Sequence, residues 1–255
     1  MFYHIENIKN TVIQGDALEV LKRIPPEVFD MVFIDPPYFL QLKRKRLKRW
    51  NSKTLVKGVF EEWDRFSSFE EYDSFIESLL LEVKRVMKPN ATLWVMGTYH
   101  NIFRVGKIMQ DLGFWILNDV IWVKTNPMPN WLGVRFTNAT ETLIWAVKDK
   151  SVKNYTFNRE YAKSFGIGKI GANVWLLPTC SKKERLPHPT QKPLELLRRV
   201  ILTSTKEGDL ILDPLAGTGT TGYAAKMLGR DFVLIEKNPQ YVQLIRERLS
   251  QSLLK

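Results

Sequence analysis

The sequence predicts an α/β fold with a doubly wound, mostly parallel sheet. Short apolar runs alternate with segments of helical periodicity along most of the chain. Several of the strand-like runs end at an acidic residue followed by a loop, a placement typical of ligand sites beside the carboxyl ends of parallel strands. A length of 255 residues suits one large α/β domain, alone or with a smaller insertion.

Two strand–helix units begin the chain. A strand at 11–14 precedes a helix at 17–24, whose apolar residues recur at helical spacing until two prolines stop it. The next strand, 29–34, is a short apolar run. Ser68 and Glu71 have the spacing of a capping box, which predicts a helix start there.

The alternation continues with one interruption. From 125 to 187 the periodicity fades, and this stretch carries prolines, aromatic residues and basic residues. We therefore expect a loop-rich insertion at 125–187 and a main domain formed by 1–124 and 188–255. The remaining expected strands are 91–96, 114–124, 141–148, 210–212 and 232–235, and the remaining helices are 101–112, 193–205, 219–228 and 239–249.

The composition is basic, with 38 Lys and Arg against 27 Asp and Glu and a net charge of +11. Such a surface favours a polyanionic partner such as nucleic acid, and an inert basic surface is the alternative. No apolar run approaches the roughly 18–20 residues of a membrane span, and no secretory signal is evident. Cys180 is the only cysteine, so no intramolecular disulfide and no structural metal site are expected. A cytoplasmic protein is predicted.

A basic loop is expected at 39–66. Eight Lys and Arg residues and no acidic residue lie between 39 and 60. The charges favour contact with a phosphate backbone, and a solvated charge run is the alternative. The residues first expected to make that contact are Lys43, Arg44, Lys45, Arg46, Lys48 and Arg49.

A glycine-rich loop at 213–222 joins a predicted strand to a predicted helix. Its glycines let the backbone approach a ligand, and the helix N-terminus offers free N–H groups. Glu236 ends the following strand, where a carboxylate can accept hydrogen bonds from ribose hydroxyls. The glycine spacing also fits a dinucleotide, whereas no lysine follows as a P-loop requires.

The tetrad Asp35-Pro36-Pro37-Tyr38 follows the strand at 29–34. The exocyclic amine of a nucleobase is a poor nucleophile because its lone pair is delocalised into the ring. A carboxylate and a rigid backbone carbonyl that accept its N–H bonds localise that lone pair, and an adjacent aromatic ring can stack on an extruded base. The alternative is a proline-terminated strand with a buried tyrosine.

The tetrad followed by the glycine-rich loop resembles the β class of amino-group DNA methyltransferases, which use S-adenosylmethionine. The resemblance spans nearly the whole chain and implies a Rossmann-like, circularly permuted fold, in which the strand at 11–14 completes the cofactor half. It implies methyl transfer to adenine N6 in duplex DNA by base flipping and direct in-line transfer. Asp as the first tetrad residue is similar to adenine-N6 enzymes, and a cytosine-N4 enzyme is the alternative. Whether the chain forms a homodimer or accompanies a restriction nuclease stays open.

The resemblance also implies roles for individual residues. Asp35, Pro36, Pro37 and Tyr38 are expected to be catalytic. Segment 135–141 is similar to a family segment beside the target-base pocket, so Arg135 is expected to contact DNA. Trp131, in the proline-rich loop of 125–187, the expected target-recognition insertion, is also expected to contact DNA. Leu215 departs from the family, which commonly has Phe there. The residues expected to bind the cofactor are Asp16, Ala17, Asp35, His188, Thr190, Lys192, Asp213, Pro214, Leu215, Gly217, Thr218, Gly219, Thr220, Thr221, Glu236 and Asn238.

Overall fold

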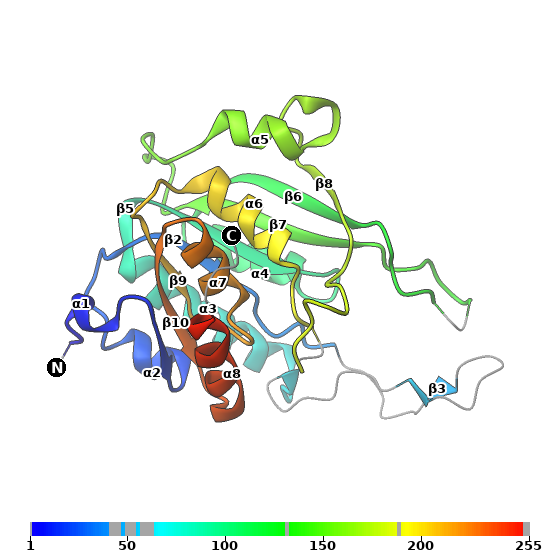
Figure 1. The fold of residues 1–255 in the computed structure, drawn as a ribbon, viewed down its shortest axis with the longest axis horizontal. Coiled ribbons are helices and arrows are strands. Elements are labelled where there is room, and N and C mark those ends of the chain that lie inside the picture. Colours follow the sequence, from blue (N-terminus) through cyan, green and yellow to red (C-terminus); the bar gives the residue numbers. More distant parts are fainter. Residues whose placement is uncertain are drawn as a thin grey trace.

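An eight-stranded sheet forms the centre of the molecule (Figure 1). The computed structural model describes residues 2–40, 47–48, 55–56, 64–130, 133–187 and 190–251. The sheet strands are β1 (Thr11–Gln14), β2 (Phe29–Ile34), β5 (Met87–Gly97), β6 (Trp115–Lys124), β7 (Thr140–Val147), β8 (Val174–Leu177), β9 (Leu210–Asp213) and β10 (Asp231–Glu236). A separate antiparallel pair consists of β3 (Leu47–Lys48) and β4 (Leu55–Val56).

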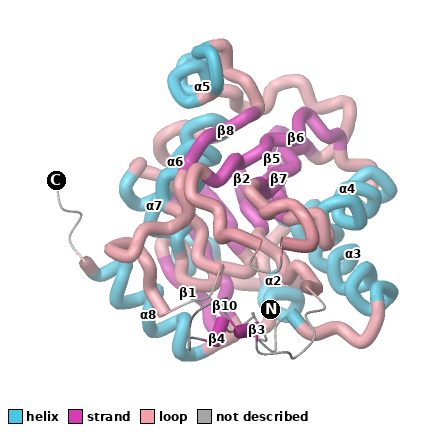
Figure 2. Tube along the Cα trace, turned by 90° about the vertical axis from the view of Figure 1, so that its right-hand side faces the viewer, coloured by secondary structure: helices cyan, strands magenta, loops and turns pink. Residues whose placement is uncertain are grey.

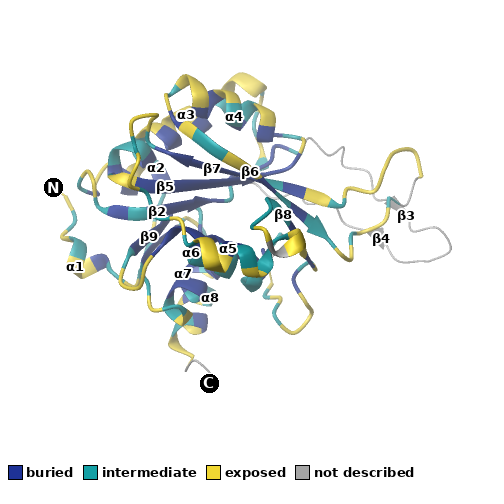
Figure 3. Cartoon of the chain, turned by 90° about the horizontal axis from the view of Figure 1, so that it is seen from above, coloured by how far each residue is buried: buried dark blue, intermediate teal, exposed yellow. Residues whose placement is uncertain are grey.

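Helices cover both faces of the sheet (Figure 3). Residues of α2, α3 and α4 pack into one apolar layer, and residues of α6, α7 and α8 pack into the other. The helices are α1 (Ile5–Ile8), α2 (Ala17–Leu21), α3 (Phe69–Val86), α4 (Ile102–Asp111), α5 (Arg159–Phe165), α6 (Leu194–Ser204), α7 (Thr220–Met227) and α8 (Pro239–Ser250), with a 3-10 turn at Ile167–Lys169.

The sheet order is β1-β10-β9-β2-β5-β7-β6-β8, from one edge to the other. Figure 2 shows β8 and β6 at the end of the sheet away from β1 and β10. The first five strands in this order pair in parallel, β7 runs against both of its neighbours, and β8 pairs in parallel with β6. This arrangement confirms the predicted α/β class with a mostly parallel, doubly wound sheet. The parallel pairing of β1 with β10, with Gln14 opposite Glu236, agrees with the expectation that the N-terminal strand completes this half.

The winding reverses between β9 and β2. The chain leaves β2 through α3 toward β5 and leaves β9 through α7 toward β10, so the two crossovers cover opposite faces. Open α/β sheets bind ligands beyond the carboxyl ends of their strands at such a reversal. Asp35, directly after β2, and Asp213, the last residue of β9, stand at this point.

Most of the predicted elements are present. The stretch 125–187, expected to be a loop-rich insertion, contains two strands. β7 and β8 lie within this range, yet both belong to the main sheet, and β7 is inserted between β5 and β6. This segment therefore contributes two strands to the sheet, with loops on either side of them. The sequence did not reveal β8 and α5 because four and seven residues are too short to show a clear period. Among the described residues, no helix has the length and apolar character needed to cross a bilayer.

The start of α3 follows the predicted capping pattern with a shift of one residue. The Ser68 hydroxyl accepts a hydrogen bond from the Glu71 backbone N–H at 3.3 Å, as a capping box requires. The Glu71 carboxylate, however, accepts from the backbone N–H of Ser67 at 2.6 Å rather than from that of Ser68. This hydrogen bond ties Ser67, in the segment that leads into α3, to the first turn of the helix.

Gly222 lets α7 lie close against the sheet. A Cβ at this position would meet Leu234 Cδ1 at 2.6 Å and Phe232 Cδ2 at 3.1 Å, both in fully packed β10. We expect Gly222→Ala to lower the free energy of unfolding by about 1–3 kcal/mol, because an added methyl overpacks this contact.

Gly106 in α4 provides a matched control, since a Cβ there would meet only Ile144 Cδ1, at 3.4 Å. Gly106→Ala should leave stability unchanged or raise it by up to about 1 kcal/mol, because alanine is the better helix former. Urea unfolding of both variants measures the difference. A Gly222→Ala variant as stable as the wild type would contradict the described packing of α7 on β10.

Candidate active site

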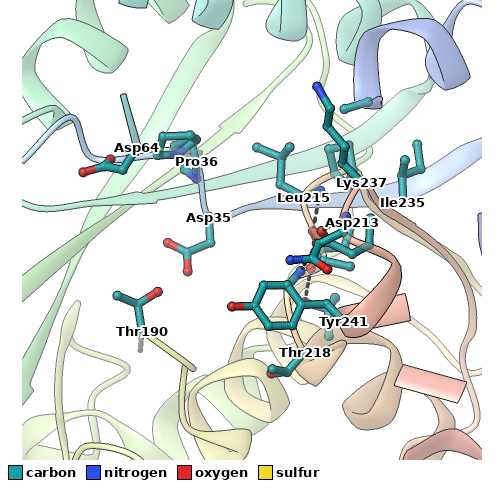
Figure 4. A pocket seen from close by; sticks show the side chains of 18 of the residues that line it. Asp35, Pro36, Asp64, Thr190, Asp213, Leu215, Thr218, Ile235, Lys237 and Tyr241 are labelled. Atoms are coloured by element: carbon teal, nitrogen blue, oxygen red, sulfur yellow. Dashed lines mark hydrogen bonds between the residues drawn. The ribbon is translucent and has the colours of Figure 1, made fainter. Parts of the chain in front are cut away.

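A cavity of about 750 Å³ lies at the carboxyl edge of the sheet, over the reversal between β9 and β2. The tetrad 35–38 and the glycine-rich loop after β9 both line it. Figure 4 shows the Asp35 carboxylate pointing into this space from one side, with Asp213, Leu215 and Thr218 on the other. The two motifs that are 178 residues apart in sequence, counted from Asp35 to Asp213, therefore share one cavity.

Two carboxylates brace the glycine-rich loop. Asp213 Oδ2 accepts a hydrogen bond from the Thr221 hydroxyl at 2.6 Å, and Oδ1 accepts from the Leu215 backbone N–H at 3.1 Å. Glu236 Oε2 accepts from the Gly217 N–H at 2.8 Å, and Oε1 accepts from the Asn238 N–H at 2.7 Å. The loop is thus held by side chains at the ends of β9 and β10 before any ligand binds.

Most residues expected to bind the cofactor line this cavity, and two need separate mention. Gly219 lies outside the lining: it has a φ of 70°, and a Cβ there would lie 2.9 Å from Ile245 Cγ1, so its role is to start α7 in close packing. His188 lies outside the described residues. The expected residues that do line the cavity are Asp16, Ala17, Asp35, Thr190, Lys192, Asp213, Pro214, Leu215, Gly217, Thr218, Thr220, Thr221, Glu236 and Asn238.

The turn after the tetrad is held in an uncommon backbone conformation. Phe39 has a φ of 50°, in the left-handed region that non-glycine residues seldom occupy. Asp64 stabilises the turn, because its carboxylate accepts from the backbone N–H groups of Phe39 at 2.6 Å and of Leu40 at 3.0 Å. The Phe39 ring packs edge-on against Phe66 and stacks on Tyr72.

The proline segment is fixed from the other side by Tyr72 of α3. Its hydroxyl donates to the Pro37 carbonyl at 2.9 Å and accepts from the Asn101 side-chain amide at 3.1 Å. Because both partners are buried, the position of the Pro37 carbonyl is set by packing rather than by solvent. The tetrad therefore presents its polar groups from a rigid frame.

A network of buried charges surrounds the tetrad carboxylate. Lys192 Nζ lies 2.7 Å from Asp35 Oδ2 and 3.7 Å from Glu141 Oε2. The Tyr38 hydroxyl lies 2.8 Å from Asp35 Oδ1 and 3.0 Å from Glu141 Oε2. Lys124 Nζ pairs with Glu141 Oε1 at 2.7 Å. The charges of two lysines and two carboxylates thus balance around one tyrosine hydroxyl. The sequence did not predict that Lys192 would pair with these carboxylates.

Burial and ion pairing shift the pKa values of the carboxylates in this network in opposite directions. Burial raises the pKa of Asp35, and the Lys192 ammonium only partly offsets that effect. Burial would also raise the pKa of Glu141, but Lys192 and Lys124 outweigh it, so the pKa of Glu141 falls below its usual value. Burial and the two neighbouring carboxylates together raise the pKa of the Tyr38 hydroxyl, which stays protonated. Asp35 is therefore the more basic of the two carboxylates.

The structure describes only some of the residues that are expected to contact DNA. Arg135 is exposed in the loop between β6 and β7, and its guanidinium donates to the Tyr99 hydroxyl at 3.0 Å. The same loop exposes the apolar side chains of Met128, Val134 and Phe136. Lys48 lies in β3, and its side chain is not described. Lys43, Arg44, Lys45, Arg46, Arg49 and Trp131 lie outside the described residues.

Sequence reasoning did not single out several residues that hold the site: Asp64, Tyr72, Asn101, Lys124 and Glu141. Each contacts the tetrad or its partner from a distant part of the chain, so no local spacing marks it. Glu141 gave the one available signal, because it ends the segment 135–141 that resembles the family's target-base segment. Within the described ranges, no three His, Cys, Asp or Glu side chains gather in a way that could hold a metal ion.

The comparisons with known proteins all point to methyltransferases. Residues 29–247 match the family model described as DNA methylase. The chain is 47% identical to the type II methyltransferase M.HinfI of Haemophilus influenzae, over 97% of this chain and 70% of that protein. It is 41% identical to the type II methyltransferase M2.LlaDCHI of Lactococcus lactis subsp. cremoris, over 98% of this chain and 92% of that protein.

Solved structures show the same fold. The crystal structure of the M1.HpyAVI–SAM complex superposes with a TM-score of 0.69 and 26% identity, over 94% of this chain and 99% of that chain. The family model covers both motifs and the strands that carry them, and the relatives match nearly the full length of this chain. The chain therefore belongs to the DNA methylase family and is a DNA methyltransferase.

Proposed function

We propose that this DNA methyltransferase moves a methyl group from S-adenosylmethionine to the N6 amino group of adenine in duplex DNA. One observation carries the proposal: the tetrad carboxylate and the glycine-rich loop line the same cavity. A methyl donor held by the loop and an amino group held by Asp35 would then meet within one cavity. Close approach in a fixed orientation accounts for much of the rate in such reactions.

The residues of the cavity fit the proposed cofactor. Leu215, Ile235 and Pro239 offer an apolar wall for an adenine ring, and Glu236 retains acceptor lone pairs for ribose hydroxyls beside its two backbone bonds. Gly219 begins α7 without a side-chain cap, so N–H groups at this end remain available to a carboxylate. When bound, S-adenosylmethionine supplies an electrophilic methyl group.

The chain's own residues orient the amino group. Asp35 accepts a hydrogen bond from N6, together with the Pro36 carbonyl, and the Tyr38 ring stacks against the flipped base. The bracing of the turn by Asp64 and Tyr72 keeps these acceptors in place during the reaction. Transfer is direct and in line, without a covalent intermediate on the protein.

The base is assigned to adenine because Asp stands first in the tetrad. Cytosine N4 carries the same kind of amino group, so an N4 methyltransferase is the second candidate. The geometry of Asp35 suits both bases, since each presents an exocyclic amine to the carboxylate. Product identity, rather than binding, separates the two.

DNA is proposed to lie across the basic loop 39–66 and the loops of 125–187. The net charge of +11 and exposed Arg135 support this placement, because phosphate contacts depend on Lys and Arg. The exposed Phe136 and Val134 beside Arg135 suit apolar contact with bases or sugars. A homodimer, a companion restriction nuclease and a cytoplasmic location stay predictions from the sequence.

The first prediction concerns the reaction itself. Wild-type protein incubated with S-adenosylmethionine and unmethylated plasmid should yield N6-methyladenine in nucleosides analysed by mass spectrometry. Asp35→Ala should abolish the product. It should also lower the thermal melting temperature, because the buried Lys192 ammonium loses its nearest carboxylate, and circular dichroism checks that the variant is folded. Asp111→Ala, an exposed change in α4, is the control and should keep full activity. N4-methylcytosine as the product would overturn the adenine assignment, and normal turnover by Asp35→Ala would overturn the mechanism.

The second prediction concerns Asp213 and pH. Burial raises the pKa of Asp213 from near 3.8 to about 7, so the folded protein favours the protonated acid. The unfolded chain ionises first, and this residue therefore lowers stability progressively as the pH rises from about 4 to about 7. Asp213→Asn cannot ionise, so its stability relative to the wild type should increase across this range and change no further above it.

Urea unfolding without cofactor, at a series of pH values between about 4 and 8, measures that difference. Asp209→Asn, at the residue before β9, is the comparison. Burial also raises the pKa of Asp209, but Asp209 is less buried than Asp213, so its substitution should change the pH dependence of stability less. A difference in stability between Asp213→Asn and the wild type that stays constant with pH would show that folding does not raise the pKa of Asp213.

The third prediction concerns the basic loop. Each phosphate contact adds about −0.9 to the slope of log affinity against log salt concentration. Replacing Lys43, Arg44, Lys45 and Arg46 with Ser should make the slope shallower by up to about four such contributions. Lys22→Ser, an exposed change directly after α2, is the control. A slope equal to that of the wild type would show that this stretch does not contact DNA, and loss of binding to cognate duplexes alone would place it in the recognition surface.

A further inference from the structure

The contacts of the Tyr38 hydroxyl pose a problem of proton count. A phenol carries one proton, yet this oxygen lies within hydrogen-bond distance of two carboxylates, Asp35 Oδ1 and Glu141 Oε2. If both carboxylates are ionised, the single proton serves one of them. The other contact then brings two oxygen atoms together without a proton between them, in a buried place where that is costly.

One additional proton satisfies both contacts. With a proton on Asp35 Oδ1, Asp35 donates to the Tyr38 oxygen, and the Tyr38 O–H turns to donate to Glu141. Each short distance then contains a hydrogen. Asp35 is the carboxylate whose pKa is raised, whereas two lysines keep Glu141 ionised, so the added proton belongs on Asp35.

The proposed methyl transfer releases one proton at this place. We propose that Asp35, Tyr38 and Glu141 form one proton-accepting unit for the target amino group, with Glu141 acting as a positioning residue through the Tyr38 hydroxyl. This inference rests on the proposed function, and it assigns a role to Glu141 and to the Tyr38 hydroxyl, as distinct from its ring.

The step balances as follows in atoms and charge. The bond from N6 to the methyl carbon forms while the bond from that carbon to sulfur breaks, and the electron pair of the broken bond stays on sulfur. The methylated nitrogen carries the positive charge until its N–H bond breaks. The proton moves to Asp35 and rests on Oδ1, because Oδ2 faces the Lys192 ammonium. After the product leaves, the proton passes to water in the cavity.

The surrounding charges suit a unit of this kind. Lys192, from the segment before α6, and Lys124, at the end of β6, balance the charges of the two carboxylates when the unit holds no additional proton. Asp213, at the end of β9, is near enough for the charge of Asp35 to raise its pKa, and the protonated acid that burial favours adds no charge to the unit. The Asp35 side chain is 21% exposed, toward the cavity, so a bound base would separate it from bulk water. An internal acceptor is then needed.

The pH dependence of a single turnover tests the unit. The rate of wild type should fall on the acid side as Asp35 becomes protonated. Glu141→Gln removes a negative charge that raises the proton affinity of the unit, so this fall should move to lower pH by about one unit or more. Glu195→Gln, an exposed change of the same kind in α6, should leave the profile unchanged.

Tyr38→Phe keeps the ring and tests in which direction the acid limb of the pH–rate profile moves. If the hydroxyl only donates to ionised Asp35, its loss should move the acid limb to higher pH. In the proposed unit the hydroxyl makes two bonds when the proton is present and one when it is absent, so its loss should move the limb to lower pH. The plateau rate should fall by about 100-fold. Fluorescence of 2-aminopurine at the target position should show base flipping as in the wild type.

Each outcome bears on one of the two claims. If the wild type transfers no methyl group to DNA, the proposed function fails. If it does, and the acid limb stays in place in Glu141→Gln or moves upward in Tyr38→Phe, the proton-accepting unit is overturned while the function stands. Calorimetry of S-adenosylmethionine binding and thermal melting identify a variant that has lost its fold, and the other variant then decides.

Discussion

The parallel pairing of β2 with β9 is the constraint on which the site depends. It places Val32 beside Leu212, so that Asp35 and Asp213 emerge at the same edge of the sheet although they are far apart in the chain. The crossovers after these strands leave toward opposite faces, and the space between them forms the cavity. Gly222 and Gly219 keep α7 close enough to β10 for the glycine-rich loop to line that space.

The second requirement is the compensation of buried charge. Four ionised side chains taken from water would destabilise the fold unless each one had a partner at short range. Here β6, β7, the tetrad and the segment before α6 each contribute one charge, and the Tyr38 hydroxyl joins the two acids. The same contacts hold Asp35 in position and adjust its affinity for a proton. Packing, electrostatics and the proposed chemistry therefore depend on one network.

The sequence revealed the parts of the site that are local in the chain. The tetrad and the glycine-rich loop carry recognisable residue types at short spacing, and the strands before them are clear apolar runs. Asp64 and Lys124 could not be found in this way, because they reach the site through the turn after the tetrad and through the pairing of β6 with β7. β8 escaped notice because four residues, Val174–Leu177, are too few to show a clear period.

A crystal structure with S-adenosylhomocysteine and a duplex carrying the methylation site would test the central claim most directly. The account predicts the cofactor product against Leu215 and Glu236 and an extruded adenine whose N6 lies within hydrogen-bond distance of Asp35. It also predicts the sulfur on the side of N6 opposite to the carboxylate. A target base that stays stacked in the duplex, or a cofactor product bound outside the cavity between Asp35 and Asp213, would contradict it.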